Sequence, residues 1–136
     1  MTDRTALLAL AGRVERLTGP DREVDAEIWL AVTPGATRRK TSYVHAATQR
    51  TCELDETRVL QPDGRRELVI VPNYTASLDA ALTLVLEDAW VSLTMQRQMN
   101  RADIRWSDDS SVVRSGATPA LAMVAAALRA RAGDAP

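Results

Sequence analysis

The side chains of this sequence that are best suited to bind a ligand are cationic. A guanidinium group holds phosphate or carboxylate oxygens through paired hydrogen bonds, and an aromatic ring beside it can stack on a base. If the fold gathers them, these groups form an electropositive binding surface, although interspersed acidic residues weaken its field. The candidate binding residues are Arg38, Arg39, Lys40, Arg65, Arg66, Arg97, Arg101, Arg105 and Trp106.

A catalytic centre has fewer candidates. Nucleophilic catalysis by a thiol needs a thiolate beside a base that a third group orients. Cys52 and His45 are the only cysteine and the only histidine, and Asp55 or Glu56 could orient the imidazole. Their proximity in sequence does not place them together in space. We therefore assign no catalytic residue and favour a protein without enzymatic activity, while the question of catalysis stays open.

Metal and cofactor sites have no sequence signal here. Asp108 and Asp109 form an acidic pair without the glycine-centred loop that calcium requires. The acids between Asp21 and Glu27 alternate around a predicted helix, so they cannot all converge on one ion. No glycine-rich phosphate loop or dinucleotide motif is present. We expect no metal ion and no cofactor.

Length and composition favour one ordinary globular domain. The 136 residues include 46% apolar and 26% charged residues, with a formal net charge of -1. This balance gives no overall field toward nucleic acid or anionic lipid, so neither is an expected partner. A single cysteine cannot form an internal disulfide framework. Without a membrane-spanning apolar run or a secretory signal, we expect a cytoplasmic protein.

Helices are predicted at both ends of the chain. Apolar residues from Leu7 to Leu17 recur at three- and four-residue steps, with Thr2 or Asp3 as the N-cap. A second helix is predicted to start at Pro20 and to end before Thr33. The last helix has Thr118 as cap and Pro119 as first residue, and Gly133 ends it. Its alanines allow close approach to a sheet.

Strands are predicted in the middle of the chain. Strand-like pieces occur at 42–46 and 57–60, and the turn at 62–64 pairs the second piece with residues 67–71 in a hairpin. A short third helix follows a cap at Thr75 or Ser77. From Trp90 the apolar residues alternate, which predicts a strand, a turn around Asn100, and a return strand at 102–107. Another short strand is predicted at 111–114.

These elements predict an α/β (α+β) fold. We expect a three-layer helix–sheet–helix sandwich, with a small, mainly antiparallel sheet and about four helices. Residues 1–132 are expected to form one domain, in which 36–71 is a variable, insertion-like segment. Residues 133–136 are predicted to be a flexible tail.

Three blocks of the sequence resemble a known family. They are the helix pair around residues 18–28, the segment 74–85, and the segment from 117 to 132. Together they resemble the phage "ABA sandwich" domain proteins, small phage and prophage proteins defined by architecture rather than activity. The resemblance implies a three-layer arrangement. This chain departs from the family where Leu86-Glu87-Asp88-Ala89 replaces a Pro-Glu-Gly turn before Trp90, and residues 36–71 match no part of it.

Three functional hypotheses follow from the resemblance and from the missing catalytic motifs. The leading one is a non-enzymatic phage or prophage accessory protein that acts by binding, with a host defence or regulatory protein as the partner, in the bacterial cytoplasm. A second is a protein that sequesters a phosphate-bearing small molecule, such as a nucleotide-type signal, through the arginines. A third is a structural or self-assembling phage component, which implies a homo-oligomer.

Overall fold

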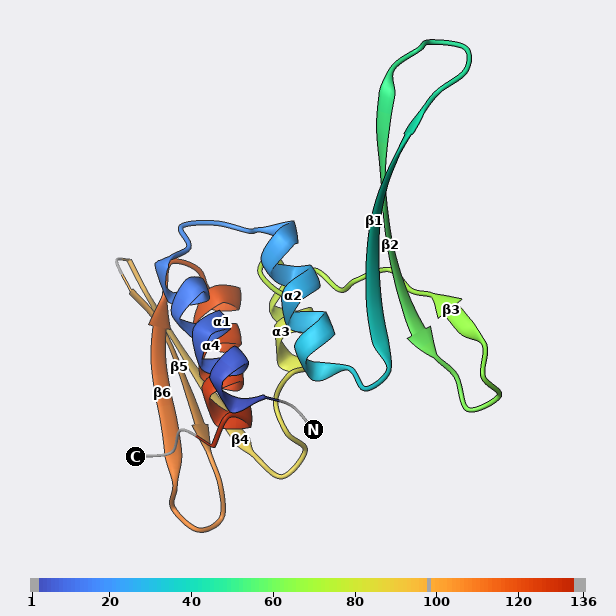
Figure 1. The fold of residues 1–136 in the computed structure, drawn as a ribbon. Coiled ribbons are helices and arrows are strands. Elements are labelled where there is room, and N and C mark those ends of the chain that lie inside the picture. Colours follow the sequence, from blue (N-terminus) through green and yellow to red (C-terminus); the bar gives the residue numbers. More distant parts are fainter. Residues whose placement is uncertain (1–2, 98, 134–136) are drawn as a thin grey trace.

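The computed structural model describes residues 3–97 and 99–133, and it divides into a body and a projecting arm (Figure 1). The body contains the four helices of the described residues and the sheet β4–β5–β6. The arm, residues 36–68, contains the sheet β1–β2–β3 and extends away from the helices. In chain order the elements are α1 (Arg4–Arg16), α2 (Arg22–Val32), β1 (Ala36–Val44), β2 (Thr51–Leu60), β3 (Arg66–Leu68), α3 (Leu78–Leu82), β4 (Trp90–Gln96), β5 (Met99–Arg105), β6 (Ser111–Gly116) and α4 (Pro119–Arg131).

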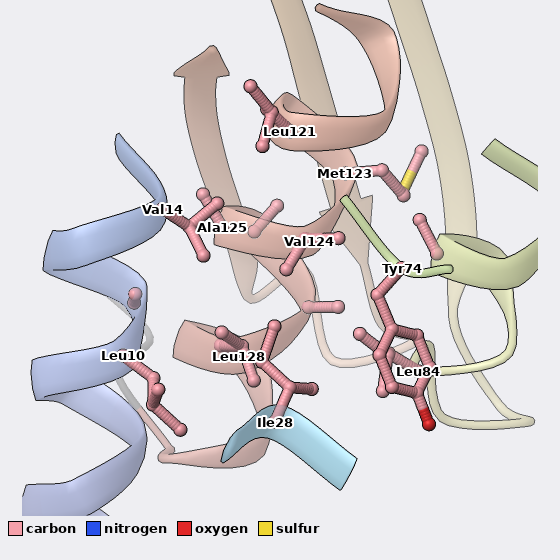
Figure 2. Packing of buried hydrophobic residues seen from close by; sticks show 14 of the residues in the cluster. Leu10, Val14, Ile28, Tyr74, Leu84, Leu121, Met123, Val124, Ala125 and Leu128 are labelled. Atoms are coloured by element: carbon pink, nitrogen blue, oxygen red, sulfur yellow. The ribbon is translucent and has the colours of Figure 1, made fainter. Parts of the chain in front are cut away.

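Helix α4 is the centre of the body. All residues from Ala120 to Leu128 are buried, so no side of the helix faces water along this stretch. A helix that is apolar all round is stable only when other elements surround it. Helix α4 contacts α1, α3 and the three strands of the body sheet. In Figure 2, Leu10 and Val14 of α1 point toward α4, with the sheet behind it.

The body sheet contacts α4 with one face. Ala102, Ile104 and Val112 are buried on this face, and the register places Ile104 beside Val112. On the opposite face Trp90 is 73% exposed, opposite Arg105 on the neighbouring strand. The alternation predicted from Trp90 onward is confirmed as β4: the register places Val91 and Leu93 on the face toward α4 and Trp90 on the solvent face, and no side chain of β4 is fully buried.

The close approach of β6 to α4 depends on Gly116. A Cβ atom at this position would lie 2.5 Å from the backbone nitrogen of Ala122 and 2.9 Å from its Cα. Real Cβ atoms do not come this near to backbone, so only glycine fits. Small residues on both elements bring the strand end and the first turns of α4 into contact.

Capping residues define the helix ends. The carboxylate of Asp3 accepts from the N–H of Thr5, while Thr2 lies outside the described residues. Asp21 caps α2 by accepting from two backbone N–H groups, so the prediction that the helix starts at Pro20 is wrong by two residues. Ser77 caps α3, and Thr118 caps α4 with Pro119 in the first turn, as predicted.

The predicted fold class is confirmed: over the described residues the chain is α+β, with four helices and small antiparallel sheets in a layered sandwich. In this part of the chain the strands form two sheets rather than one. The segment 36–71, unmatched in the family resemblance, forms the second sheet and links it to α3. The other predicted tail residues, 134–136, lie outside the described residues, while Gly133 follows α4 with a positive φ of 73°.

Several predicted strand boundaries are wrong. The hairpin between β2 and β3 is confirmed, but β3 ends at Leu68 instead of residue 71. Strands β1 and β2 are longer than the predicted pieces, since they pair continuously from Ala36 opposite Val59 to Val44 opposite Thr51. Asn100 lies within β5 rather than in a turn, because the register already pairs Gln96 with Met99.

Replacing Gly116 with alanine tests the contact between β6 and α4. We expect Gly116→Ala to reduce the free energy of unfolding by about 1–3 kcal/mol, because the added methyl group meets backbone that cannot yield cheaply. Urea unfolding followed by circular dichroism measures the change. Gly19→Ala is the control, since a Cβ added at that position would meet nothing within 4 Å. Equal stability of the two variants would contradict the proposed packing constraint.

Candidate functional site

The arm is the most exposed ordered part of the described chain. Strands β1 and β2 form one antiparallel hairpin, closed by a turn in which the N–H of His45 donates to the Arg50 carbonyl at 2.9 Å. Beyond the cross-strand pair Lys40–Asp55, nearly every residue is exposed. We call residues 41–54 the arm tip. Threonine, tyrosine and valine favour the extended backbone of these strands, although no core covers them.

The two faces of the arm differ because side chains alternate along a strand. Even-numbered residues of β1 and odd-numbered residues of β2 point toward the side of α2, and we call this the inner face. The outer face carries the odd-numbered residues of β1 and the even-numbered residues of β2 and β3. The cations of the inner face are paired with carboxylates of α2 and β2, whereas the outer face has more cations than carboxylates.

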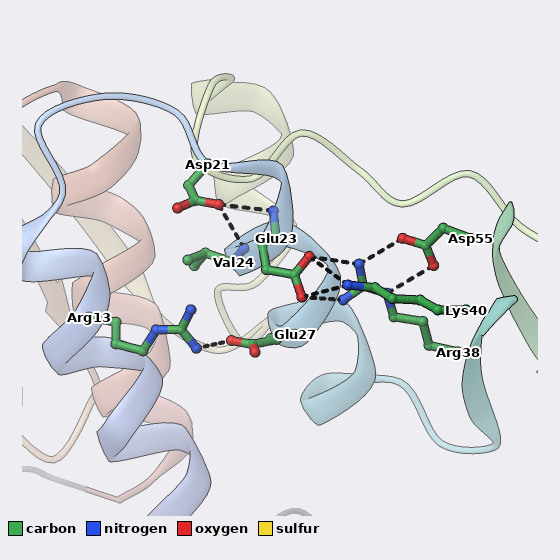
Figure 3. Close-up of polar contacts among 8 residues, drawn as sticks. All are labelled: Arg13, Asp21, Glu23, Val24, Glu27, Arg38, Lys40 and Asp55. Carbon is green, nitrogen blue, oxygen red and sulfur yellow. Dashed lines mark hydrogen bonds and ion pairs between the residues drawn. The ribbon is translucent and has the colours of Figure 1, made fainter. Parts of the chain in front are cut away.

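On the inner face, Arg38 joins the arm to α2 (Figure 3). Its guanidinium donates to both carboxylate oxygens of Glu23, at 2.9 and 2.8 Å, and to both of Asp55, at 3.0 and 2.7 Å. The Arg38 side chain is only 12% exposed. Lys40 adds a contact of 3.3 Å to Glu23. Arg38 therefore acts as a clamp between strand and helix, with its hydrogen-bonding capacity used inside the molecule.

This clamp lowers the pKa values of both carboxylates that it binds. Hydrogen bonds from Arg38, and next from Lys40, lower the pKa of Glu23 below 4.5. Hydrogen bonds from Arg38 likewise lower the pKa of Asp55 below 3.8. The same partners raise the pKa of Arg38, so it stays charged. Both carboxylates are therefore ionised at neutral pH, and the clamp is fully formed there.

A second contact fixes the chain where it returns from the arm to the body. Asp25 of α2 is completely buried, and its carboxylate accepts from the N–H and the hydroxyl of Thr75, both at 2.8 Å. Arg22 donates to Asp25 at 3.1 Å and to the Val71 carbonyl at 3.1 Å. A buried charge is tolerated only with such partners. The stretch 71–75 is thus fastened to α2.

On the outer face, three guanidinium groups stand near one carboxylate. Arg39, Arg58 and Arg66 line a hollow of about 440 Å³ together with Thr37 and Glu56. Glu56 accepts from Arg58 at 2.9 and 3.2 Å, and Arg66 donates to the Thr37 hydroxyl at 3.3 Å. Within the described part of the chain, Arg39 makes no side-chain hydrogen bond or ion pair. The outer face therefore keeps unneutralised positive charge.

The predicted cationic residues do not form one surface, because they lie on two separate sheets. Arg38, Arg39, Lys40, Arg65 and Arg66 belong to the arm, and Arg38 and Lys40 are already paired on its inner face. Arg65 lies in the turn before β3 and pairs with Asp63 at 3.6 Å. Arg97, Arg101 and Arg105 lie on or beside β5, where Arg105 pairs with Asp103 at 3.0 Å. Trp106 is half-buried against the core.

The structure gives no support to a Cys–His catalytic pair. His45 is exposed beside the turn of the arm, and Cys52 lies on the outer face, with its thiol 3.9 Å from the Arg50 carbonyl. Asp55 points to the inner face, where it binds Arg38, and Glu56 binds Arg58. Neither carboxylate is thus placed to orient an imidazole. Both candidate groups lie on an exposed hairpin rather than in a water-poor cleft.

Metal-binding clusters and membrane-spanning helices are both absent from the described residues. Over 3–97 and 99–133, no group of three or more histidine, cysteine, aspartate or glutamate side chains could hold a metal ion. In the same residues, each helix is too short or too polar to span a bilayer.

Sequence reasoning missed Glu23 and Arg58 as members of the charged clusters. The signal for Arg58 was its spacing of two residues from Glu56, which puts both side chains on one face of a strand, whereas Glu23 meets Arg38 only in the tertiary structure. No family model, no curated protein and no solved structure matches the chain. The role of the arm therefore has to be inferred from its own geometry.

Removing the clamp tests how the arm is held. We expect Arg38→Met to increase amide hydrogen exchange in β1 and β2 near α2, because Glu23 and Asp55 lose their shared donor. Exchange in α4 should not change. The control is Arg39→Met, on the neighbouring residue that faces outward. Hydrogen-exchange mass spectrometry of both variants measures the difference, and equal exchange in the two would contradict the clamp.

The effect of Arg38→Met on hydrogen exchange should depend on pH, because the clamp needs both carboxylates in their ionised form. Their pKa values are lower in the folded arm than in the free chain. The clamp's contribution is therefore complete above the ordinary values of 4.5 and 3.8, and it is lost as the pH falls through the lowered values. The difference in exchange between the wild type and Arg38→Met should disappear in that acidic range.

The buried cluster around Asp25 gives a separate prediction. Thr75→Val keeps the shape of the side chain but removes the hydroxyl that donates to the carboxylate. We expect the free energy of unfolding to fall by about 1–3 kcal/mol, since a buried charged acceptor loses a partner. Urea unfolding measures this. The control is Thr94→Val, on the exposed side of β4, which should change the free energy of unfolding by less than about 0.5 kcal/mol. An equally small change for Thr75→Val would contradict the role of the buried cluster.

Proposed function

We propose that this protein is a non-enzymatic accessory protein that acts by binding another protein, and that the arm is its binding element. The observation that carries the proposal is the arm tip, a two-stranded ribbon with both faces in water. Tyr43 is 50% exposed, Val44 60% and Leu54 43%. An isolated hairpin is marginally stable in water, so a tip of this kind gains stability when a partner covers it.

The composition of the arm fits a protein partner. Interfaces between proteins are enriched in tyrosine and arginine beside apolar residues. The arm combines Tyr43, Arg39 and Arg58 with exposed leucines on one face. The fold leaves this face open, because the contact between the arm and α2 uses the inner face.

The biological setting is part of the same proposal. The resemblance to the phage ABA sandwich proteins supports an accessory role in a phage or prophage, with a host defence or regulatory protein as the partner in the bacterial cytoplasm. The layered α+β body agrees with that resemblance. Segment 36–71, which the resemblance does not cover, is the segment that contains the arm, and a variable binding element on a common body suits a family with different partners.

A structural, self-assembling component is the second candidate. It is favoured by the outer edge of β1, which has no neighbouring strand in the described part of the chain. Residues Thr41–Val44 of this edge carry no charge, so a second copy could add a strand there. Sequestration of a small phosphate-bearing ligand is less favoured, since the predicted arginines are divided between two sheets.

Shortening the arm tests the proposal. Lys40 and Asp55 are directly opposite in the hairpin, so an Asn-Gly turn can join them in place of residues 41–54. The shortened protein should keep the circular dichroism spectrum and thermal midpoint of the full chain, because the body is unchanged. Full chain immobilised on a resin is expected to retain a partner from host lysate in stoichiometric amounts, as measured by mass spectrometry. The shortened chain should not retain this partner, and the comparison is repeated with the purified partner.

Two results would contradict the proposal. One is a partner retained equally by the full and shortened chains, which would place binding on the body. The other is recovery of no stoichiometric partner by the full chain. Light scattering separates the second candidate, since a defined oligomer of the full chain that becomes monomeric on shortening favours self-assembly.

A further inference from the structure

We infer that the outer face of the arm binds an acidic, extended segment of the partner protein, flanked by apolar residues. This inference rests on the proposed function and names the chemistry of the partner. It depends on the arrangement of charge and apolar surface over β1, β2 and β3.

The positive charge lies at the middle of this face. Arg39 and Glu56 are directly opposite, and Thr37 and Arg58 form the next cross-strand pair. Arg66 reaches the same place from β3, where it donates to Thr37. Glu56 accepts from Arg58, so among the described residues the one carboxylate lining the hollow orients one guanidinium and leaves two without a carboxylate partner. Paired carboxylates from another chain would match these groups.

The contrast with the inner face shows that this charge is not general to the arm. Arg38 and Lys40 are neutralised by Glu23 and Asp55 within the molecule. Among the strand residues of the arm, the guanidinium groups without a carboxylate partner, Arg39 and Arg66, therefore lie on one face, where complementary charge can direct the orientation of binding.

Apolar side chains lie on both sides of the arginines. Leu54 is 43% exposed and Tyr43 50% exposed toward the tip, while Leu60 is 48% and Leu68 60% exposed toward β3. From Cys52 to Leu60 the strand extends about 27 Å at about 3.4 Å per residue. An extended segment of about eight residues has the same length. The face thus matches a segment with an acidic centre and an apolar residue at each end.

This composition favours a protein segment over nucleic acid. Phosphate backbones are bound by many cations with few apolar contacts, and the affinity depends steeply on salt. Here exposed leucines flank a small cluster of arginines, and the opposite face carries Glu53 and Asp55. Nucleic acid is therefore an outcome of the test rather than the proposed ligand.

The test uses the full chain and a labelled ten-residue peptide. Its sequence is Leu-Ser-Leu, four glutamates, then Leu-Ser-Leu, and a second peptide has glutamines in place of the glutamates. Fluorescence anisotropy measures binding. The test variant is Arg39→Gln with Arg66→Gln, which leaves Arg58 paired with Glu56. The matched control, Arg65→Gln with Arg101→Gln, removes the same charge from the β2–β3 turn and from the body sheet.

We expect saturable binding of the glutamate peptide by the wild type, at least tenfold weaker binding of the glutamine peptide, and at least tenfold weaker binding of the glutamate peptide by the test variant. The control variant should bind as the wild type does. Absence of saturable binding, equal loss in the test and control variants, or tighter binding of a single-stranded DNA of ten nucleotides would overturn the inference.

The same variants separate this inference from the proposed function. The shortened chain could lose the captured partner while Arg39→Gln/Arg66→Gln retains it fully. This result would reject the inference of an acidic segment but keep the arm as the binding element. Retention of the partner by both the shortened chain and this variant would reject both.

Discussion

The burial of α4 on every side is the constraint on which the rest of the body depends. A helix without a polar face cannot lie on the surface, so strands must cover one side and helices the others. Its alanines set the separation of these elements, since small side chains allow backbone to approach backbone. Gly116 allows the same close approach from the side of β6, because a Cβ atom at this position would overlap the backbone of Ala122. The body is therefore held mainly by apolar contact around one helix.

The arm is held by different forces. Its tip buries little apolar surface. At its base Ala36, Val59 and Val69 pack against the core, and two polar contacts with α2 add to this attachment: the Arg38 clamp and the buried Asp25 cluster. The first fastens the strands, and the second fastens the chain that returns to the body. Helix α2 takes part in both, and it packs through Ile28 into the apolar core. It therefore transmits the rigidity of the body to the arm, which has no core of its own.

Patterns of local sequence predicted the elements of the body, although not the start of α2 or the place of Asn100 within β5. The caps at Asp3, Ser77 and Thr118, the alternation after Trp90 and the alanine-rich last helix each depend on residues close together in sequence. The long arm was not predicted, because recognising a strand usually relies on one buried face, and neither face of the arm tip is buried. Both faces of the arm carry cations and carboxylates, and which of them meet becomes visible only once the register pairs β1 with β2. The division of the arginines between two sheets likewise depends on tertiary structure.

Neighbouring arginines in β1 show why residue type alone could not identify the site. Arg38 and Arg39 have the same chemistry and adjacent positions, but the strand turns them to opposite faces. Arg38 meets two carboxylates and serves the structure, whereas Arg39 meets solvent and stays available. Stability and binding can therefore change independently along the arm. Under the proposed function, outer-face residues could vary with the partner while inner-face residues keep the arm in place, and this separation is what the proposal requires of a projecting binding element.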